Sequence, residues 1–193
     1  MKRIQDFSVI DTLWLNSSSY ILILKSETSI EKIDPGNFAE IKIPDAADIF
    51  LRRPISVYDV DHEKKEISFY IKAIGKGTSK LGSLLPGSKV NIVYPLGNSY
   101  TPVKNKNALI VGGGSGIAPF KLLGEQLRGL GSKVTYLFGA RTSEEIVLTD
   151  VFSKLGKFNC TTEDGSLGEK GLVTSHSIFK NIKYFDIVYT CEI

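Results

Sequence analysis

Residues 108–119 read ALIVGGGSGIAP, and this stretch indicates the fold of the second half of the chain. Ala108–Val111 is a continuous apolar run of strand length, which is typical of a strand buried on both faces of a parallel sheet. The glycine-rich segment Gly112–Gly116 follows at once, and a helical pattern runs from Ile117 to Leu130. A buried strand, a glycine turn and a helix in this order predict the first unit of an α/β domain.

The same alternation continues toward the end of the chain. Further strands are predicted at Val134–Phe138, Phe158–Thr161 and Phe185–Tyr189, and further helices at Thr149–Leu155 and Leu172–Phe179. Strands that alternate with helices form parallel βαβ units, which are usually right-handed. We therefore expect an α/β domain with a parallel sheet over residues 102–193.

The first hundred residues have a different sequence pattern. Short segments rich in β-branched and aromatic residues are bounded by Gly, Pro, Asp, Asn or Ser, which predicts antiparallel strands. These segments are Val9–Leu15, Tyr20–Lys25, Phe38–Ile43, Ile55–Val60, Glu66–Ala73 and Lys89–Val93. Ser79–Leu85 has room for one or two helical turns. The spacing favours a small β-barrel or sandwich over residues 1–101.

The chain has 193 residues, with 24 basic and 21 acidic side chains and two cysteines. This length suits one large domain or two small ones. The charge is spread evenly, so no basic tail or stripe indicates nucleic acid as a partner. The apolar runs are far shorter than the roughly 20 residues that span a bilayer, and no signal-peptide core follows Met1, so we expect a cytoplasmic protein without a membrane segment. Two cysteines are too few for a disulfide framework, and no Cys/His cluster predicts zinc.

The glycine turn is the strongest local motif. Glycines let the backbone approach a ligand, and a helix that follows them favours an anion such as a diphosphate. Pro119 suits the first turn of that helix, where no intrahelical N–H is required. The pattern is not G-x-G-x-x-G, because Pro119 stands where the third glycine would be, and it is not a P-loop. Two interpretations remain open at this stage, which are a nucleotide site and a tight turn that needs glycine for its geometry.

Two motifs in the first half are each ambiguous. Arg52 and Arg53 precede Pro54, Ile55 and Ser56 at the head of a strand, where a guanidinium can bind diphosphate oxygens. The same pair also fits a solvated strand face. The segment 75–78, GKGT, is either an anion-binding turn or an ordinary loop.

Together, these motifs resemble the ferredoxin-reductase family of flavoproteins. More narrowly, LRRPISVYDV at 51–60, GKGT at 75–78 and PLGN at 95–98 look like the electron-transfer subunit of the NAD-dependent, two-subunit (type B) dihydroorotate dehydrogenase. The resemblance covers nearly the whole chain. It implies an N-terminal FAD-binding antiparallel β-barrel over residues 1–101 and a C-terminal NAD-binding α/β domain over residues 102–193.

The resemblance also implies which residues bind the cofactors. Arg53 would pair with the FAD diphosphate, Ser56 would lie near the reactive flavin edge, and Ile55 stands where many relatives have an aromatic residue. The FAD-site residues implied are Arg53, Pro54, Ile55, Ser56, Tyr70, Ile71, Lys72, Gly77 and Thr78. The NAD-site residues implied are Gly112, Gly113, Gly114, Gly116, Pro119, Arg141 and Cys191. NAD rather than NADP rests on the resemblance alone, since Arg141 could accept a 2′-phosphate and no acidic residue ends Val134–Phe138.

The sequence departs from the family pattern at its C-terminal end. Relatives have Cys-Gly-Pro at the end of the last strand, whereas Cys191 is followed by Glu192 and Ile193. The family continues into a module with a 2Fe-2S cluster, which needs four cysteine thiolates or their equivalents. With two cysteines, this sequence cannot supply them, so we expect the second domain to be truncated and the cluster to be absent.

The resemblance implies a flavoprotein that moves electrons between NAD(H) and FAD. In the complete complex, electrons from dihydroorotate would pass from an FMN-containing catalytic subunit, in a heterotetramer, through the cluster to FAD and NAD in pyrimidine biosynthesis. Two alternatives remain open. The first is another NAD(P)H-linked flavin reductase subunit of the hydrogenase or transhydrogenase type, and the second is a non-catalytic flavin-binding fragment.

Overall fold

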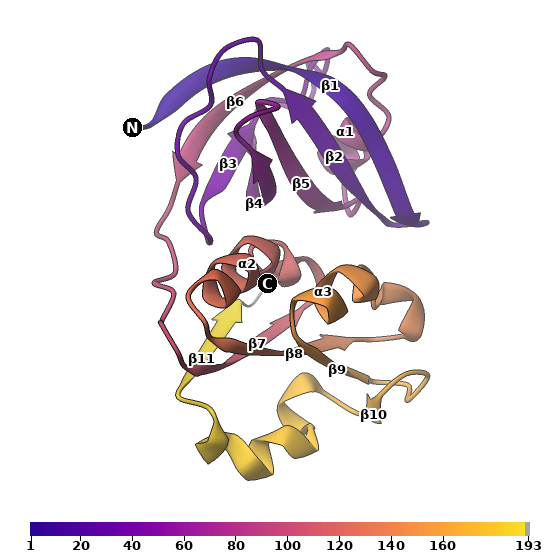
Figure 1. The fold of residues 1–193 in the computed structure, drawn as a ribbon. Helices are drawn as coiled ribbons and strands as arrows, with labels where there is room; N and C mark the ends of the chain where they lie inside the picture. Colours follow the sequence, from indigo (N-terminus) through magenta and orange to yellow (C-terminus); the bar gives the residue numbers. More distant parts are fainter. Residues whose placement is uncertain (192–193) are drawn as a thin grey trace. The chain divides into compact units, whose positions relative to one another are not determined.

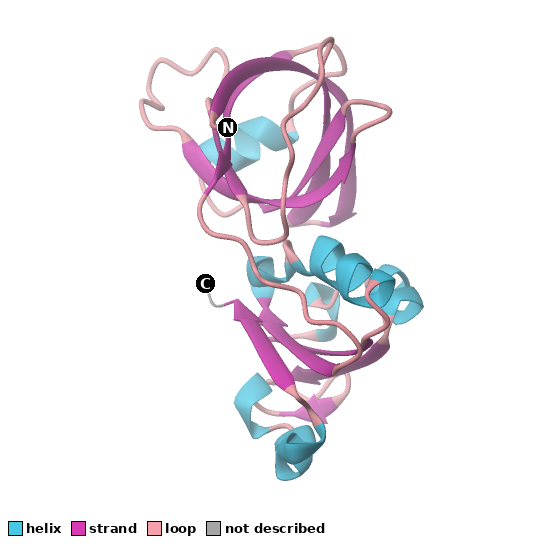
Figure 2. Cartoon of the chain, turned by 60° about the vertical axis from the view of Figure 1, so that its left-hand side comes forward, coloured by secondary structure: helices cyan, strands magenta, loops and turns pink. Residues whose placement is uncertain are grey.

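Within residues 1–191, which the computed structural model describes, the first six strands form a closed antiparallel barrel (Figures 1 and 2). The order around the barrel is β1-β2-β5-β4-β3-β6. The strands are β1 (Arg3–Asn16), β2 (Ser19–Lys25), β3 (Phe38–Ile41), β4 (Arg53–Asp61), β5 (Glu66–Lys72) and β6 (Lys89–Leu96). The prediction of an antiparallel β-barrel is confirmed, and β1 extends six residues before the predicted start at Val9.

The barrel interior is apolar because alternate side chains of each strand point inward. In β6, for example, Val90, Ile92 and Tyr94 are buried, while the residues between them are partly exposed. Strand β1 closes the barrel by pairing with both β2 and β6, and β-bulges interrupt its register with β2. Bulges bend a strand and raise its local twist, which lets one long strand take part in closure.

Helix α1 (Lys76–Gly82) is fixed to the barrel through Gly82. A Cβ atom at Gly82 would lie 2.9 Å from both the Trp14 and the Tyr20 rings, so glycine is needed for this close contact. The two rings themselves pack with centroids 4.8 Å apart. The helix begins three residues before the predicted start at Ser79 and ends before Leu84, so the turn 75–78 belongs to its first turn.

The remaining strands of the described chain form a parallel sheet with the order β10-β9-β8-β7-β11. Its strands are β7 (Asn107–Gly113), β8 (Lys133–Ala140), β9 (Lys157–Thr162), β10 (Glu169–Lys170) and β11 (Ile187–Cys191). Residues 108–112 of β7 are all buried, because α2 (Phe120–Gly129) and α3 (Thr149–Leu155) cover one face and short 3-10 helices cover the other (Figure 1). This confirms the predicted α/β domain with a parallel sheet.

The face under α2 and α3 has an aromatic core. Tyr136 and Phe138 contact Phe152 with ring centroids 5.0 and 4.7 Å apart. Gly124 of α2 lies directly over Tyr136, since a Cβ there would come within 1.7 Å of the Tyr136 hydroxyl oxygen. Glycine in a helix interior normally lowers stability, so its presence here is explained by the packing of α2 on the sheet.

Two helix predictions need correction. The segment predicted as a helix at Leu172–Phe179 forms 3-10 helices at η3 (Val173–Ser175) and η4 (Ser177–Tyr184). His176 between them is extended, with φ −60° and ψ 140°, and its Nδ1 accepts a hydrogen bond from the Ile178 N–H, which interrupts a regular helix. The helix predicted from Ile117 begins at Phe120, because a 3-10 turn, η1 (Gly114–Ile117), comes first. Strand β10 was not predicted, since it has only two residues.

The chain divides into two compact units, Met1–Ser99 and Tyr100–Ile193. Among the described residues, no helix is long and apolar enough to cross a membrane.

Candidate functional site

Arg52 and Arg53, at the start of β4, have different surroundings. The Arg52 guanidinium donates to the backbone oxygens of Glu40 (3.2 Å) and Asn91 (3.1 Å) and to Asn91 Oδ1 (2.6 Å). These bonds tie Arg52 to β3 and β6. Arg53 instead donates from Nη1 to the carbonyl oxygens of Leu51 (2.8 Å) and Arg52 (3.4 Å), within its own segment. Arg52 therefore stabilises the barrel by connecting neighbouring strands. The hydrogen bonds of Arg53 go to residues 51 and 52 at the start of β4.

Arg53 lies against the first turn of α1. A Cβ atom at Gly77 would lie 2.8 Å from Arg53 Nε, which is closer than side-chain carbons normally approach. Glycine at position 77 therefore lets the guanidinium reach the backbone of this turn. Guanidinium N–H groups beside a glycine-containing turn are an arrangement suited to diphosphate oxygens. The structure brings together these two motifs, which are separate in sequence.

The turn itself is held in shape by Thr78. Its hydroxyl accepts from the N–H groups of Ile74 (3.1 Å) and Gly75 (3.2 Å) and donates to the Gly75 carbonyl oxygen (3.1 Å). The Thr78 carbonyl oxygen accepts a hydrogen bond from the Tyr20 hydroxyl of the barrel. Thr78 and Tyr20 therefore preorganise the turn beside Arg53, and Tyr20 is a site-supporting residue that the sequence motifs did not indicate.

The other β4 residues predicted for the site lie along the same strand. Successive strand residues face opposite sides, so Arg53 and Ile55 share one face and Pro54 and Ser56 the other. Pro54 is exposed, whereas Ile55 and Ser56 are half-buried. Their contact with a flavin stays a prediction.

The residues predicted on β5 are more enclosed. Tyr70 and Ile71 are both 1% exposed, and Lys72 is half-buried. Ile71 shares a face with Phe69 and Ile67, which are fully buried in the barrel core. Ile71 is therefore enclosed in the barrel core, and its contact with a ligand stays a prediction.

In the second unit, the strand order of the sheet reverses at β7. Strand β8 lies on one side of β7, and the later strand β11 lies on the other. In open parallel sheets, ligands bind outside the carboxyl ends of the strands at such a switch point. Strand β7 ends at Gly112 and Gly113, and Cys191 at the end of β11 is in register with Gly112. The fold thus brings the glycine turn and Cys191 to one edge of the sheet.

Each glycine of this turn is required for a different structural reason. A Cβ at Gly112 would lie 2.6 Å from the Phe120 ring, and one at Gly113 would lie 3.3 Å from the Gly139 carbonyl oxygen. Gly114 has φ +53°, which disfavours residues with a Cβ. The turn therefore needs glycine for packing and backbone geometry, and it also leaves main-chain atoms open to a ligand.

Gly116 and Pro119 complete the passage from β7 to α2. Gly116 is buried within η1, and Pro119 precedes α2 with a helical φ of −72°. Proline is tolerated there because its missing N–H is not needed in the first turn.

Two cavities adjoin Gly113. One, of about 500 Å³, is lined mainly by apolar groups such as Val111, Phe179 and Val188, together with Gly112 and Cys191. The other, of about 250 Å³, lies at the ends of β7, β8 and β9 and carries charged groups, which are Arg141, Glu145 and Glu163. The Gly113 backbone therefore lies between an apolar cavity and a polar one.

Tyr100 is a further residue at this edge that the motifs did not indicate. Its hydroxyl donates to the Thr190 carbonyl oxygen (2.8 Å) and is also hydrogen-bonded to the Cys191 thiol. Its ring packs against Phe120 and Tyr189, with centroids 6.1 and 5.8 Å apart. Burial, with a smaller effect of Cys191, raises the pKa of Tyr100 to about 12, so the hydroxyl keeps its proton and positions the end of β11.

The buried tyrosines predict loss of stability at alkaline pH. Burial raises the pKa of Tyr20 above its ordinary value of 10.0, and it raises that of Tyr100 to about 12. Their contribution to the free energy of unfolding is fully present below pH 10, and it falls as the pH rises toward the folded-state pKa values, by at most about 1.4 kcal/mol per pH unit for each group. Denaturant unfolding between pH 8 and 11.5 measures this slope.

Matched variants identify the source of that slope. Tyr20→Phe should reduce the pH dependence of the free energy of unfolding. Tyr184→Phe should leave that dependence unchanged, because Tyr184 is 65% exposed. A slope that is the same in all three proteins would contradict the assignment to Tyr20.

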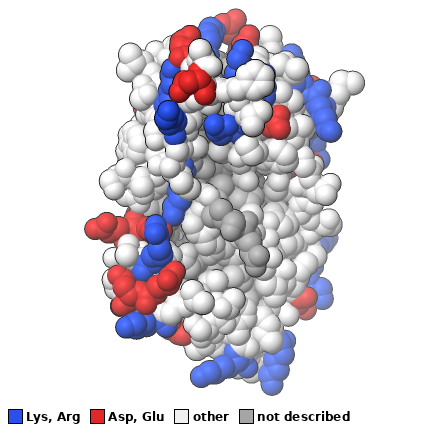
Figure 3. Space-filling model, turned by 180° about the vertical axis from the view of Figure 1, so that it is seen from behind, with Lys and Arg blue, Asp and Glu red and all other residues white. Residues whose placement is uncertain are grey.

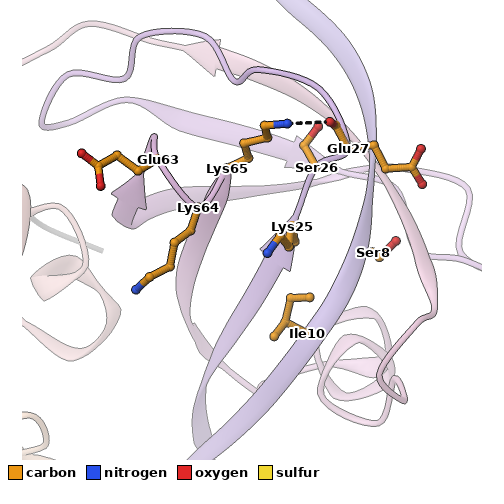
Figure 4. A pocket seen from close by; sticks show the side chains of 8 residues that line it. All are labelled: Ser8, Ile10, Lys25, Ser26, Glu27, Glu63, Lys64 and Lys65. Carbon is orange, nitrogen blue, oxygen red and sulfur yellow. Dashed lines mark hydrogen bonds between the residues drawn. The ribbon is translucent and has the colours of Figure 1, made fainter.

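A further cavity, of about 640 Å³, lies on the barrel surface beside the β4–β5 hairpin (Figure 4). Its lysines already have partners, since Lys65 donates to the Glu27 carbonyl oxygen (2.9 Å) and Lys25 pairs with Glu66 (3.7 Å). Basic and acidic side chains are also interspersed over the barrel in Figure 3. This surface has no concentration of one charge that would favour a charged ligand.

No group of three or more His, Cys, Asp or Glu side chains within residues 1–191 could hold a metal ion. Neither Cys160 nor Cys191 forms a disulfide, and Cys160 is buried. The residues present therefore do not fit a 2Fe-2S cluster, which needs four such ligands.

Comparison with curated proteins identifies close counterparts, although no protein-family model matches the chain. The "Dihydroorotate dehydrogenase B (NAD(+)), electron transfer subunit" of Shouchella clausii is 33% identical over 176 residues, which are 90% of this chain and 68% of that protein. The protein of the same name in Lysinibacillus sphaericus is 33% identical over 195 residues, which are 99% of this chain and 75% of that protein.

Solved structures share the architecture. An NADH-dependent reduced ferredoxin-NADP oxidoreductase has a TM-score of 0.82 and 26% identity, over 96% of this chain and 67% of that one. A ferredoxin NADP+ reductase from Neisseria gonorrhoeae, solved with bound FAD and NADP, has a TM-score of 0.77 and 15% identity, over 97% of this chain and 83% of that one. The second likeness concerns the fold alone.

A closed barrel followed by a parallel sheet, together with these neighbours, defines the chain as a ferredoxin-reductase-like oxidoreductase. Within that class, it belongs to the family of dihydroorotate dehydrogenase B electron transfer subunits. The resemblance that the motifs at 51–60, 75–78 and 95–98 indicated is confirmed.

Proposed function

We propose that this chain moves electrons between NAD(H) and FAD as an electron transfer subunit of a dihydroorotate dehydrogenase. Residues 1–101 form the FAD-binding domain, and residues 102–193 form the NAD-binding domain. The observation that carries the proposal is the placement of Arg53 against Gly77, because it joins the two barrel motifs into one anion site. Membership of the family supports the choice of ligands.

The barrel residues fit FAD. Arg53 supplies a guanidinium for the diphosphate beside the turn at Gly77 and Thr78, where a Cβ at position 77 would clash with Arg53 Nε. Pro54, Ile55 and Ser56 continue from Arg53 along β4, and Tyr70, Ile71 and Lys72 lie on β5, which pairs with β4. In this proposal, Ile55 offers an aliphatic contact to the flavin on the face that it shares with Arg53. Ser56, on the other face of β4, lies at the edge of the ring and offers it a hydroxyl hydrogen bond.

The glycine turn fits the diphosphate of NAD(H). Gly112, Gly113 and Gly114 present their backbone at the switch point, and Gly116 and Pro119 complete the turn into α2. Cys191 lies in register with Gly112 on the neighbouring strand, so we place it beside the nicotinamide end. Tyr100 holds that strand end through its bond to the Thr190 carbonyl oxygen.

The chemistry of electron transfer comes from the flavin, which accepts a hydride equivalent and can release electrons singly. The chain's own groups bind and orient the two cofactors. Arg53 and the turn at Gly77 hold the FAD diphosphate, while Tyr20 and Thr78 keep that turn rigid. The glycine turn at β7 presents its backbone to the dinucleotide and positions it.

We further propose a catalytic partner, since the relatives are named as subunits of a dehydrogenase. The partner would contain FMN, oxidise dihydroorotate and form a heterotetramer with this chain in the cytoplasm, in pyrimidine biosynthesis. No step is assigned to a 2Fe-2S cluster, because Cys160 and Cys191 do not provide its ligands.

The first experiment is to measure cofactor content and reduction. The purified protein should contain FAD or bind added FAD at micromolar concentration, and anaerobic addition of NADH should bleach the flavin absorbance. Failure to bind FAD would contradict the proposal. Flavin that binds and is bleached by neither NADH nor NADPH would indicate a non-catalytic flavin-binding protein instead.

A further inference from the structure

The polar cavity beside Gly113 has an internal ion pair. Arg141, directly after β8, contacts Glu145 through Nη2 (2.8 Å) and Nε (3.0 Å), so the carboxylate binds two nitrogens of the guanidinium. The Arg141 side chain is 75% exposed, whereas that of Glu145 is 17% exposed. The more enclosed carboxylate therefore anchors the exposed guanidinium at this cavity.

A second carboxylate is held at the same cavity by the loop after β9. The Glu163 N–H donates to the Ala140 carbonyl oxygen (3.0 Å), and the Asp164 N–H donates to the Arg141 carbonyl oxygen (3.2 Å). The two loops are also joined by the Ser143 N–H, which donates to Ser166 Oγ (2.8 Å). These bonds hold the backbone at Glu163 next to that at Arg141, and Glu163 lines the same cavity as Arg141 and Glu145.

We propose that Glu145 is a specificity-determining residue that makes this site select a dinucleotide without a 2′-phosphate. This inference rests on the proposed function, because it assumes that the glycine turn binds a nicotinamide dinucleotide. The cavity is lined by one guanidinium and two carboxylates, so its formal charge is negative. A 2′-phosphate would add about two negative charges beside them.

The charges also indicate which end of the nucleotide occupies this cavity. Carboxylates accept hydrogen bonds from a ribose diol, as acidic residues do at the adenosine ribose in dinucleotide-binding folds. The cavity on the other side of Gly113 is mainly apolar and includes Cys191. A diphosphate at Gly113 therefore places the adenosine ribose beside Glu145 and Glu163.

Arg141 alone would favour the opposite selection. A free guanidinium binds phosphate oxygens in a bidentate manner. Glu145 binds the Nε and Nη2 groups of Arg141 and neutralises its charge, so it competes with a 2′-phosphate for the guanidinium. From the sequence alone, Arg141 could bind the 2′-phosphate of NADP. Its ion pair with Glu145 favours the opposite interpretation, which is selection of NAD.

Calorimetric binding of NAD⁺ and NADP⁺ to the purified protein tests the proposal. The wild type should bind NAD⁺ more tightly than NADP⁺. Glu145→Gln should tighten NADP⁺ binding roughly tenfold, the effect of one added charge-assisted hydrogen bond, and should change NAD⁺ binding less than threefold. The double variant with Arg141→Ala should lose the gain. Glu144→Gln is the matched control, because it removes a neighbouring carboxylate that does not line the cavity, and it should leave the preference unchanged.

The outcomes separate this inference from the proposed function. A wild type that binds neither dinucleotide would overturn both. A wild type that binds NAD⁺, with a preference that Glu145→Gln does not alter, would overturn the role of Glu145 alone. A wild type that prefers NADP⁺ would also contradict the inference while leaving nucleotide binding intact.

Discussion

Arg53→Ala should weaken FAD binding by about 3 kcal/mol, which is roughly a 100-fold rise in Kd. The guanidinium stands against Gly77 and is the group in this part of the barrel best placed to neutralise a diphosphate. Its hydrogen bonds go to carbonyl oxygens of its own segment, so its removal leaves the strand pairing of the barrel intact. Titration of the apo-protein with FAD, followed by flavin fluorescence, measures the change.

Arg52→Ala is the matched control for that prediction. Arg52 binds Glu40 and Asn91, so its loss should lower the free energy of unfolding by roughly 1–3 kcal/mol and leave the FAD affinity of the folded protein nearly unchanged. If both variants lost FAD equally, or if Arg53→Ala bound it normally, the diphosphate role of Arg53 would be wrong.

Gly112→Val should impair the reduction of the flavin by NADH without changing FAD binding. The Cβ would lie 2.6 Å from the Phe120 ring, so α2 and the glycine turn must move apart. A shift of about 1 Å at a site that positions reactants can reduce the rate about 100-fold. We therefore expect a loss of this order in kcat/KM for flavin reduction by NADH, measured by stopped-flow absorbance.

The barrel lies in the other unit, so FAD content should stay normal in Gly112→Val. Gly129→Ala is the control, because a Cβ there meets no atom within 4 Å and Gly129 is the last residue of α2, the helix that begins with Phe120. Normal NADH reduction in Gly112→Val would show that the glycine turn does not bind the dinucleotide.

Much of the fold could be predicted because its signals are local. The apolar run at 108–111 and the glycines after it predicted a buried strand and a turn, and both are present. The segment 172–179 is predicted as one helix within the alternation of strands and helices, yet the hydrogen bond to His176 Nδ1 interrupts a regular helix there. Such a side-chain bond competes with a helix and leaves little trace in hydrophobic periodicity.

The candidate site was predicted only in part. Arg53 and Gly77 were both selected by their motifs, whereas their contact depends on barrel closure. Tyr20 and Tyr100 support the two sites through bonds to backbone oxygens, at Thr78 and Thr190, and no local pattern identifies such residues. A hydroxyl that meets a carbonyl far away in sequence is a property of the packed chain.

By itself, the sequence determined the two-part architecture, the glycine turns and the family, since these depend on residue types at short spacings. The folded structure shows that Arg52 is bound to Asn91 of a neighbouring strand whereas Arg53 is bonded within its own segment, and that Glu145 pairs with Arg141. Charge recognition depends on distances of a few ångströms between side chains from different elements, and those distances exist only once the chain has folded.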